Sequence, residues 1–153
     1  WEYNVNNLSM NFRITDIQCA LGISQLRKLD SFILKRNKIA KEYDKIFKGK
    51  KNIIIPQRFK KIYHAYHLYP LLIDFKKTRI TKKGLFDKLK KKSINLQVHY
   101  VPLYHHKLFA KFANKKNLPI TEEFYNREIS LPIYPELKRN DIKKVANEIL
   151  NLI

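Results

Sequence analysis

Two groups of polar side chains in this sequence stand where folding alone does not require them. The first group is Asn11 and Arg13, which precede the stretch Ile14-Thr-Asp-Ile-Gln-Cys-Ala-Leu21. An amide and a guanidinium ahead of a helix N-terminus are typical of an anion site, because the free amides and the dipole of the helix already attract negative charge. A solvated loop with an asparagine turn explains the pair equally well.

The second group is His99 and Tyr100, in the stretch Gln97-Val-His-Tyr-Val-Pro102. An imidazole and a phenol at the end of a strand are suited to binding a polar ligand, because loops at such positions carry many binding residues. The alternative is a histidine with satisfied hydrogen bonds at an ordinary sheet edge. The residues alone leave both interpretations open.

Other kinds of site have little support in the sequence. The pairs His64 with His67 and His105 with His106 have poor spacing for a metal, because on a strand such residues face different sides. Cys19 falls inside a predicted helix, and no serine stands at a strand-to-helix elbow, so a nucleophilic triad is not indicated. Three glycines are too few for a phosphate-cradling loop. We therefore expect no metal site and no complete active site.

The net charge of +19 is compatible with a polyanion partner. Only 7 of the 32 basic residues are arginine, the residue preferred for bidentate recognition of phosphates and bases, which argues against a specific nucleic-acid reader. The sequence has no apolar run long enough for a membrane span and no secretory leader pattern. With a single cysteine, Cys19, expected as a small buried hydrophobe, it is interpreted as a cytoplasmic protein without a membrane partner.

The first predicted helix begins at Thr15, because Thr15 and Gln18 match a capping box. Apolar residues then recur at spacings of three and four as far as Phe47. Gly22 interrupts this pattern, and Gly49 ends it. One long helix or two consecutive helices are equally compatible with these residues.

The rest of the chain predicts short strands and helices. Strands are expected over 67–74, where Pro70 indicates an edge or bulged position, and over 94–100, with an extended segment over 130–135. Alternation in 94–100 places Ile94, Leu96, Val98 and Tyr100 on the apolar face, and His99 on the polar face. Helices are expected from Thr81, over 104–113, from Thr121 as a cap, and from Asn140 to the end. The predicted fold class is α+β with a small antiparallel sheet packed with helices.

Three motifs in this order resemble a known family. They are Asn11-Phe-Arg-Ile-Thr-Asp-Ile-Gln-Cys-Ala-Leu-Gly-Ile-Ser-Gln-Leu26, Gln97-Val-His-Tyr-Val-Pro102 and Ser130-Leu-Pro-Ile-Tyr-Pro135. The sequence resembles the C-terminal part of the nucleotide-sugar aminotransferases of the DegT/DnrJ/EryC1/StrS family, over essentially all 153 residues. Within the family it is most similar to members that act in pseudaminic acid biosynthesis.

This resemblance implies the C-terminal small domain of a fold type I, aspartate aminotransferase-like enzyme. Such enzymes use pyridoxal 5'-phosphate and are usually homodimers with active sites at the subunit interface. Residues 1–13 would form an arm to the neighbouring active site, 14–49 a long helical link to the large domain, and 50–153 the small α+β domain. The implied reaction moves an amino group from glutamate to a UDP-linked 4-keto-6-deoxy sugar.

The resemblance also assigns site residues. Asn11 would hydrogen-bond the cofactor phosphate of the neighbouring subunit, and Arg13 would lie nearby in an ion-pair or anion-facing role. His99 and Tyr100 would border the substrate pocket. The family's Schiff-base lysine belongs to a segment with no match here, and the lysines of this chain are expected on solvated helix faces, so we expect no catalytic residue and no transamination by this chain alone. The alternative function is a small basic module for polyanion or nucleic-acid binding or for dimerisation.

Overall fold

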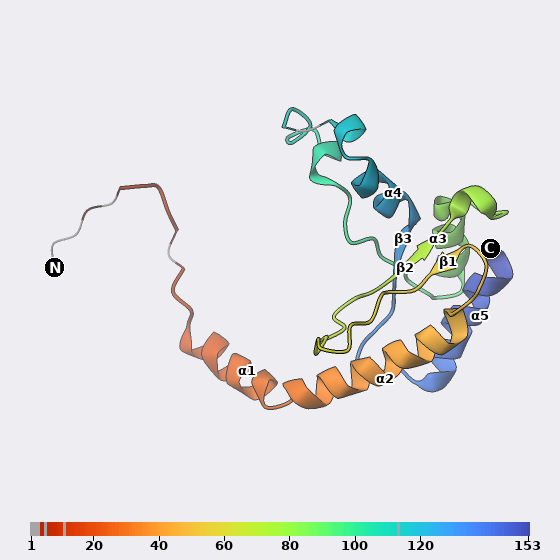
Figure 1. Ribbon diagram of the computed structural model, residues 1–153. Helices are drawn as coiled ribbons and strands as arrows, with labels where there is room; N and C mark the ends of the chain where they lie inside the picture. Colours follow the sequence, from red (N-terminus) through yellow and green to blue (C-terminus); the bar gives the residue numbers. More distant parts are fainter. Residues whose placement is uncertain (1–3, 5, 11, 113) are drawn as a thin grey trace. The chain divides into compact units, whose positions relative to one another are not determined.

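The structure, a computed structural model, describes residues 4, 6–10, 12–112 and 114–153 (Figure 1). The chain divides into two compact units, Trp1–Ser31 and Phe32–Ile153. The expected division into arm, helical link and small domain remains a prediction.

Helix α1, Asp16–Leu26, begins where the sequence predicts. The Gln18 backbone N–H donates to the Thr15 hydroxyl, and the Thr15 N–H donates to the Gln18 side chain at 2.9 Å, so the capping box is confirmed. A turn at Arg27 separates α1 from α2, Leu29–Phe47, which resolves the alternatives in favour of two helices. No α1 residue is buried, and Cys19 is only partly covered, so the expected burial of this thiol is wrong.

An antiparallel sheet of three strands lies in the Phe32–Ile153 unit. Its order is β1 (Ile53–Ile54), β2 (Tyr69–Ile73) and β3 (Glu128–Leu131), as Figure 1 shows. The expectation of an edge position for the strand with Pro70 is wrong, because β2 is central. Pro70 is tolerated there because the short β1 pairs only with Leu72 and Ile73, so Pro70 has a neighbouring strand on one side alone, where it is paired with Ser130 of β3.

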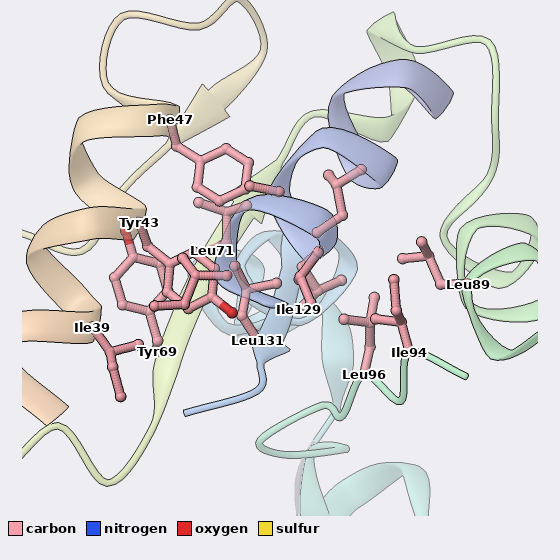
Figure 2. Close-up of a cluster of buried hydrophobic side chains, with 14 of the residues drawn as sticks. Ile39, Tyr43, Phe47, Tyr69, Leu71, Leu89, Ile94, Leu96, Ile129 and Leu131 are labelled. Carbon is pink, nitrogen blue, oxygen red and sulfur yellow. The ribbon is translucent and has the colours of Figure 1, made fainter. Parts of the chain in front are cut away.

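The core of this unit lies between α2, the sheet and the helices α3 (Lys82–Lys91) and α5 (Arg139–Leu152). Figure 2 shows Tyr43 of α2 beside Tyr69 of β2, with ring centroids 5.0 Å apart. Both hydroxyls are satisfied, Tyr43 donating to the Pro132 carbonyl at 3.0 Å and Tyr69 to Asp44 at 2.8 Å. The fold is therefore α+β with a small antiparallel sheet, as predicted.

Several predicted elements differ in the structure. Residues 94–100 form a single bridge, between Gln97 and Ser130, and no strand. Of the predicted helix over 104–113, the described residues 104–112 contain only the end of the 3-10 helix Leu103–His105, a bend and turns, because Leu108 and Phe112 are exposed and a short helix needs a buried face.

The last two helices begin before their predicted residues. Helix α4 is Pro119–Arg127, and Thr121 lies inside it because Pro119 occupies the first position, where a missing N–H costs nothing. Helix α5 begins at Arg139 after Lys138, one residue before Asn140. The remaining short helices of this unit are 3-10 helices at Phe75–Lys77 and Lys115–Asn117.

Thr81 and Thr121 give a first testable contrast, because Thr81 caps a helix and Thr121 lies inside one. The Thr81 hydroxyl accepts the Gly84 N–H at 3.1 Å at the start of α3, so Thr81→Ala is expected to lower the free energy of unfolding by about 1 kcal/mol. Thr121→Ala, at an exposed position within α4, is expected to change it by less than about 0.5 kcal/mol. Urea unfolding followed by circular dichroism measures both, and equal losses would contradict this account of the caps.

Candidate functional site

The first predicted polar group lies ahead of α1. Arg13 is exposed and stands two residues before Thr15, the N-cap of the helix. Asn11 lies outside the described residues. The basic side chain of Arg13 and the nearby helix N-terminus have the chemistry that suits an anion.

The second predicted group is arranged differently from the expected alternation. Ile94 and Leu96 are buried, but the pattern ends at Val98, after which His99 is half-buried and Tyr100 is 74% exposed. The placement of Tyr100 on the apolar face is therefore wrong, whereas His99 keeps polar contacts but is only partly exposed. The two rings meet edge to face, with centroids 4.7 Å apart, and the peptide bond between them is cis.

A backbone bridge holds His99 against β3. The Gln97 N–H donates to the Ser130 carbonyl at 3.2 Å, and the Ser130 N–H donates to the Gln97 carbonyl at 2.8 Å. Two residues further on, the His99 Nδ1 atom lies 2.8 Å from the Ser130 Oγ atom. The tertiary bridge, rather than a continuous strand, thus positions the imidazole.

Glu128 connects the same residues from within the core. Its side chain is fully buried, and its Oε2 atom accepts the His99 backbone N–H at 3.1 Å. Its Oε1 atom accepts the Ser130 hydroxyl at 2.6 Å. A buried carboxyl group is tolerated only with such partners, since each unsatisfied polar group would be costly. Glu128, Ser130 and His99 form one hydrogen-bonded network, named here the Glu-Ser-His network.

Lys82 lies close enough to this network to interact electrostatically with Glu128. Its ammonium donates to the Tyr125 carbonyl and lies 4.8 Å from the centre of the Tyr125 ring. Burial lowers the pKa of Lys82, and the negative charge of Glu128 acts in the opposite direction. The expectation that the lysines lie on solvated helix faces is therefore wrong for Lys82.

A cavity lies beside Lys82, with a volume of about 390 Å³. Val98, the residue before His99, forms part of its wall. Phe86 and Tyr125 supply aromatic surface, while Lys82 and Lys83 supply positive charge. These side chains can contact both an aromatic ring and an anionic group of a ligand.

Glu128, Ser130 and Lys82 were not predicted as site residues from the sequence. A signal for the first two was present, because Glu128 and Ser130 are two residues apart in the apolar stretch Glu128-Ile-Ser-Leu131 and would share one face of a strand. The structure brings His99 together with Glu128 and Ser130, all within the Phe32–Ile153 unit. Arg13 belongs to the other unit.

Two features are absent from the part of the chain that the structure describes. Within it, no three or more histidine, cysteine, aspartate or glutamate side chains gather in a way that could hold a metal ion. Among the same residues, no helix is both long enough and apolar enough to cross a membrane.

Solved structures share this fold. The Helicobacter pylori aminotransferase involved in the biosynthesis of pseudoaminic acid matches 99% of this chain with a TM-score of 0.85 and 36% identity, over 41% of its own chain. The PLP form of a sugar aminotransferase from Streptococcus pneumoniae, 24% identical, matches 99% of this chain and 39% of its own with a TM-score of 0.87. The fold is thus that of one part of a sugar aminotransferase.

The sequence pattern of the DegT/DnrJ/EryC1/StrS aminotransferase family matches residues 1–150, and this chain belongs to that family. A curated relative, UDP-4-amino-4,6-dideoxy-N-acetyl-beta-L-altrosamine transaminase from Helicobacter pylori, is 36% identical over 98% of this chain and 40% of its own length. The chain spans about 40% of the length of the curated relatives it matches. The family predicted from the three motifs is confirmed.

Proposed function

We propose that this chain is the C-terminal part of a pyridoxal-phosphate-dependent enzyme that transfers an amino group from glutamate to a UDP-linked 4-keto-6-deoxy sugar. The pathway would be biosynthesis of pseudaminic acid or a related surface glycan. The family match over residues 1–150 carries this proposal. Its substrate class is supported by the 36% identity to the Helicobacter pylori transaminase, whose name specifies a UDP-linked amino sugar.

His99 and Tyr100 would contact the sugar nucleotide. The Ser130 hydroxyl orients the half-buried imidazole of His99, so little rotational freedom is lost when a ligand binds. The exposed phenol of Tyr100 stands beside it and can donate or accept a hydrogen bond. These two side chains would bind and orient the sugar.

Asn11 and Arg13 would contribute to the cofactor site of a neighbouring subunit in a homodimer. The guanidinium of Arg13 and the N-terminus of α1 fit the phosphate group of pyridoxal phosphate by charge and by donor chemistry. When bound, the cofactor supplies an electron sink for the amino transfer. The residues of this chain would hold the phosphate end.

This chain alone would not transaminate, because none of its segments resembles the one that carries the family's Schiff-base lysine. Lys82, the half-buried lysine of the network region, is already bound to the Tyr125 carbonyl and attracted to Glu128. These partners favour a structural role for its ammonium. The catalytic lysine would belong to the large domain of the enzyme.

A chimeric enzyme tests the proposal. Residues 1–153 would replace the matching 40% of the Helicobacter pylori transaminase, and the two half-reactions, with glutamate and with the UDP-linked keto sugar, would be measured separately. The chimera is expected to retain pyridoxal phosphate and to perform both. His99→Ala is expected to lower kcat/KM for the sugar by about 10- to 100-fold and to leave the glutamate half-reaction within about twofold.

Asn95→Ala, at an exposed position in the same segment, is the matched control and should change neither half-reaction. A chimera that retains the cofactor and reacts with glutamate, but aminates no UDP-linked keto sugar, would contradict the proposed function. Equal effects of His99→Ala and Asn95→Ala would contradict the assignment of His99.

A further inference from the structure

We propose that Glu128 and Ser130 are positioning residues that hold neutral His99 in the tautomer with its proton on Nδ1, which makes Nε2 a hydrogen-bond acceptor for a ligand hydroxyl or N–H group. The proposal rests on the proposed function only for the identity of that ligand as a sugar nucleotide. The direction of each hydrogen bond in the Glu-Ser-His network follows from the donors and acceptors available.

The carboxylate of Glu128 begins the network, because an ionised carboxylate only accepts. Its Oε2 atom receives the His99 backbone N–H at 3.1 Å, and its Oε1 atom lies 2.6 Å from the Ser130 Oγ atom. The Ser130 hydroxyl has one proton and must donate it to Oε1. The Oγ atom can then only accept, so the proton of the 2.8 Å contact with His99 belongs to Nδ1.

The two hydrogen bonds that Glu128 accepts, from the His99 N–H and the Ser130 hydroxyl, match a carboxylate, which has no proton to donate. The half-buried ammonium of Lys82 interacts attractively with Glu128. A protonated Glu128 would reverse the network, since Ser130 would then donate to Nδ1 and leave the proton of His99 on Nε2. The tautomer of His99 therefore indicates whether Glu128 carries a proton.

The tautomer determines which ligand group His99 can bind. With Nδ1 engaged by Ser130, the second ring nitrogen is a bare acceptor, and within the described part of the chain it has no hydrogen-bond partner. A bare nitrogen attracts hydroxyl and N–H groups and is repelled by the lone pairs of phosphate oxygens. His99 would thus bind the sugar of a sugar nucleotide and not its diphosphate. Serine and glutamate would determine this preference without touching the ligand.

Histidine-ring NMR tests the proposal on the 153-residue chain without any ligand. Two-bond proton–nitrogen spectra of the ¹⁵N-labelled chain, at about pH 8 where an ordinary imidazole is neutral, distinguish the two tautomers. The His99 signal is assigned by its loss in His99→Gln. We expect the proton on Nδ1, whereas a proton on Nε2 or an equal mixture of tautomers would overturn the proposal.

Two variants test the positioning role. In Glu128→Gln the amide oxygen accepts the His99 N–H, so the amide NH₂ faces the Ser130 Oγ atom and donates to it. The Ser130 hydroxyl then donates its own proton to Nδ1 of His99. The ring proton of His99 should therefore move to Nε2. Ser130→Ala should give a mixture, and Ser24→Ala, at an exposed position in α1, should leave the tautomer unchanged. A folded Glu128→Gln chain that keeps the wild-type tautomer would contradict the relay. If it does not fold, the wild-type spectrum and Ser130→Ala remain decisive.

The two proposals fail separately. The tautomer is measured without substrate, cofactor or large domain, whereas the proposed function depends on the chimeric enzyme. An Nδ1–H tautomer together with a chimera that reacts with glutamate but aminates no UDP-linked keto sugar would preserve the positioning role and contradict the proposed function. An Nε2–H tautomer together with an active chimera would contradict the positioning role and support the proposed function.

Discussion

Replacing Glu128 by alanine is expected to lower the free energy of unfolding of the Phe32–Ile153 unit by about 3 kcal/mol. The loss has two sources. The His99 backbone N–H and the Ser130 hydroxyl lose their acceptor inside the protein, and the half-buried ammonium of Lys82 loses a nearby negative charge. An empty space also remains where a fully buried side chain was packed.

Urea unfolding of the full chain, followed by far-ultraviolet circular dichroism, measures this loss. Glu136→Ala is the matched control, because Glu136 is exposed and its ion pair with Lys35 is expected to contribute less than about 1 kcal/mol. Glu128→Gln, which keeps the volume, is expected to cost less than Glu128→Ala. Similar losses for Glu128→Ala and Glu136→Ala would show that the buried network adds no stability beyond a surface pair.

The second large effect is a loss of stability at alkaline pH, caused by Tyr43 and Tyr69. Burial raises the pKa of both phenols above the ordinary value of 10.0, and for Tyr69 the hydrogen bond to Asp44 adds to the effect. Above about pH 10 the unfolded chain loses these protons while the folded chain keeps them. The stabilisation is therefore complete below about pH 10 and is lost as the pH rises towards the folded-state pKa, by about 1.4 kcal/mol per pH unit for each tyrosine.

Lys82 acts in the opposite direction, at lower pH values that overlap the tyrosine effect only between about pH 10 and 10.5. Its pKa is lowered by burial, so its contribution to stability rises as the pH rises through its folded-state pKa towards the ordinary value of 10.5. Because two tyrosines oppose one lysine, the net effect above pH 10 is a loss of stability. Above pH 10.5 the lysine contributes no further gain, and the decline should become steeper.

Phenylalanine variants isolate the tyrosine effect. Tyr43→Phe and Tyr69→Phe are each expected to remove one proton from the pH dependence, so the free energy of unfolding should fall less steeply between about pH 10 and 11.5. Each also removes a hydrogen bond at neutral pH, so the slope is the relevant quantity. Tyr63→Phe, at an exposed position, should leave the slope unchanged. An unchanged slope in Tyr43→Phe and Tyr69→Phe would contradict this assignment.

Features that depend on residues close together in the sequence were predictable. The caps at Thr15 and Thr81 use hydrogen bonds that span three residues, so the residue types identify them directly. The apolar face of α5 repeats every three or four residues, and Ile142, Val145, Ala146 and Ile149 are buried as that spacing predicts. The three motifs likewise identified the family.

The arrangement around His99 was not predictable from those patterns. Alternation in 94–100 predicted a regular strand, but a single bridge to Ser130, 33 residues beyond Gln97, determines where the segment lies. Alternation describes one strand on one flat face and contains no information about a partner so distant in the sequence. Thr121 was misplaced for a related reason, since Pro119 begins the helix earlier.

The amino-acid order specified the helix caps, the apolar faces, the α+β class and the family, because each of these depends on neighbouring residues or on motifs in a fixed order. Folding determined that Glu128 is buried, that Ser130 connects it to His99, and that Lys82 is half-buried near Glu128. The first two properties depend on contacts 29 and 31 residues apart, which bring an acid, a hydroxyl and an imidazole into one network. The partial burial of Lys82 depends on its contact with Tyr125, 43 residues away. The likeness to the family suggested that His99 binds a ligand, and the packing around it indicates which ring nitrogen does so.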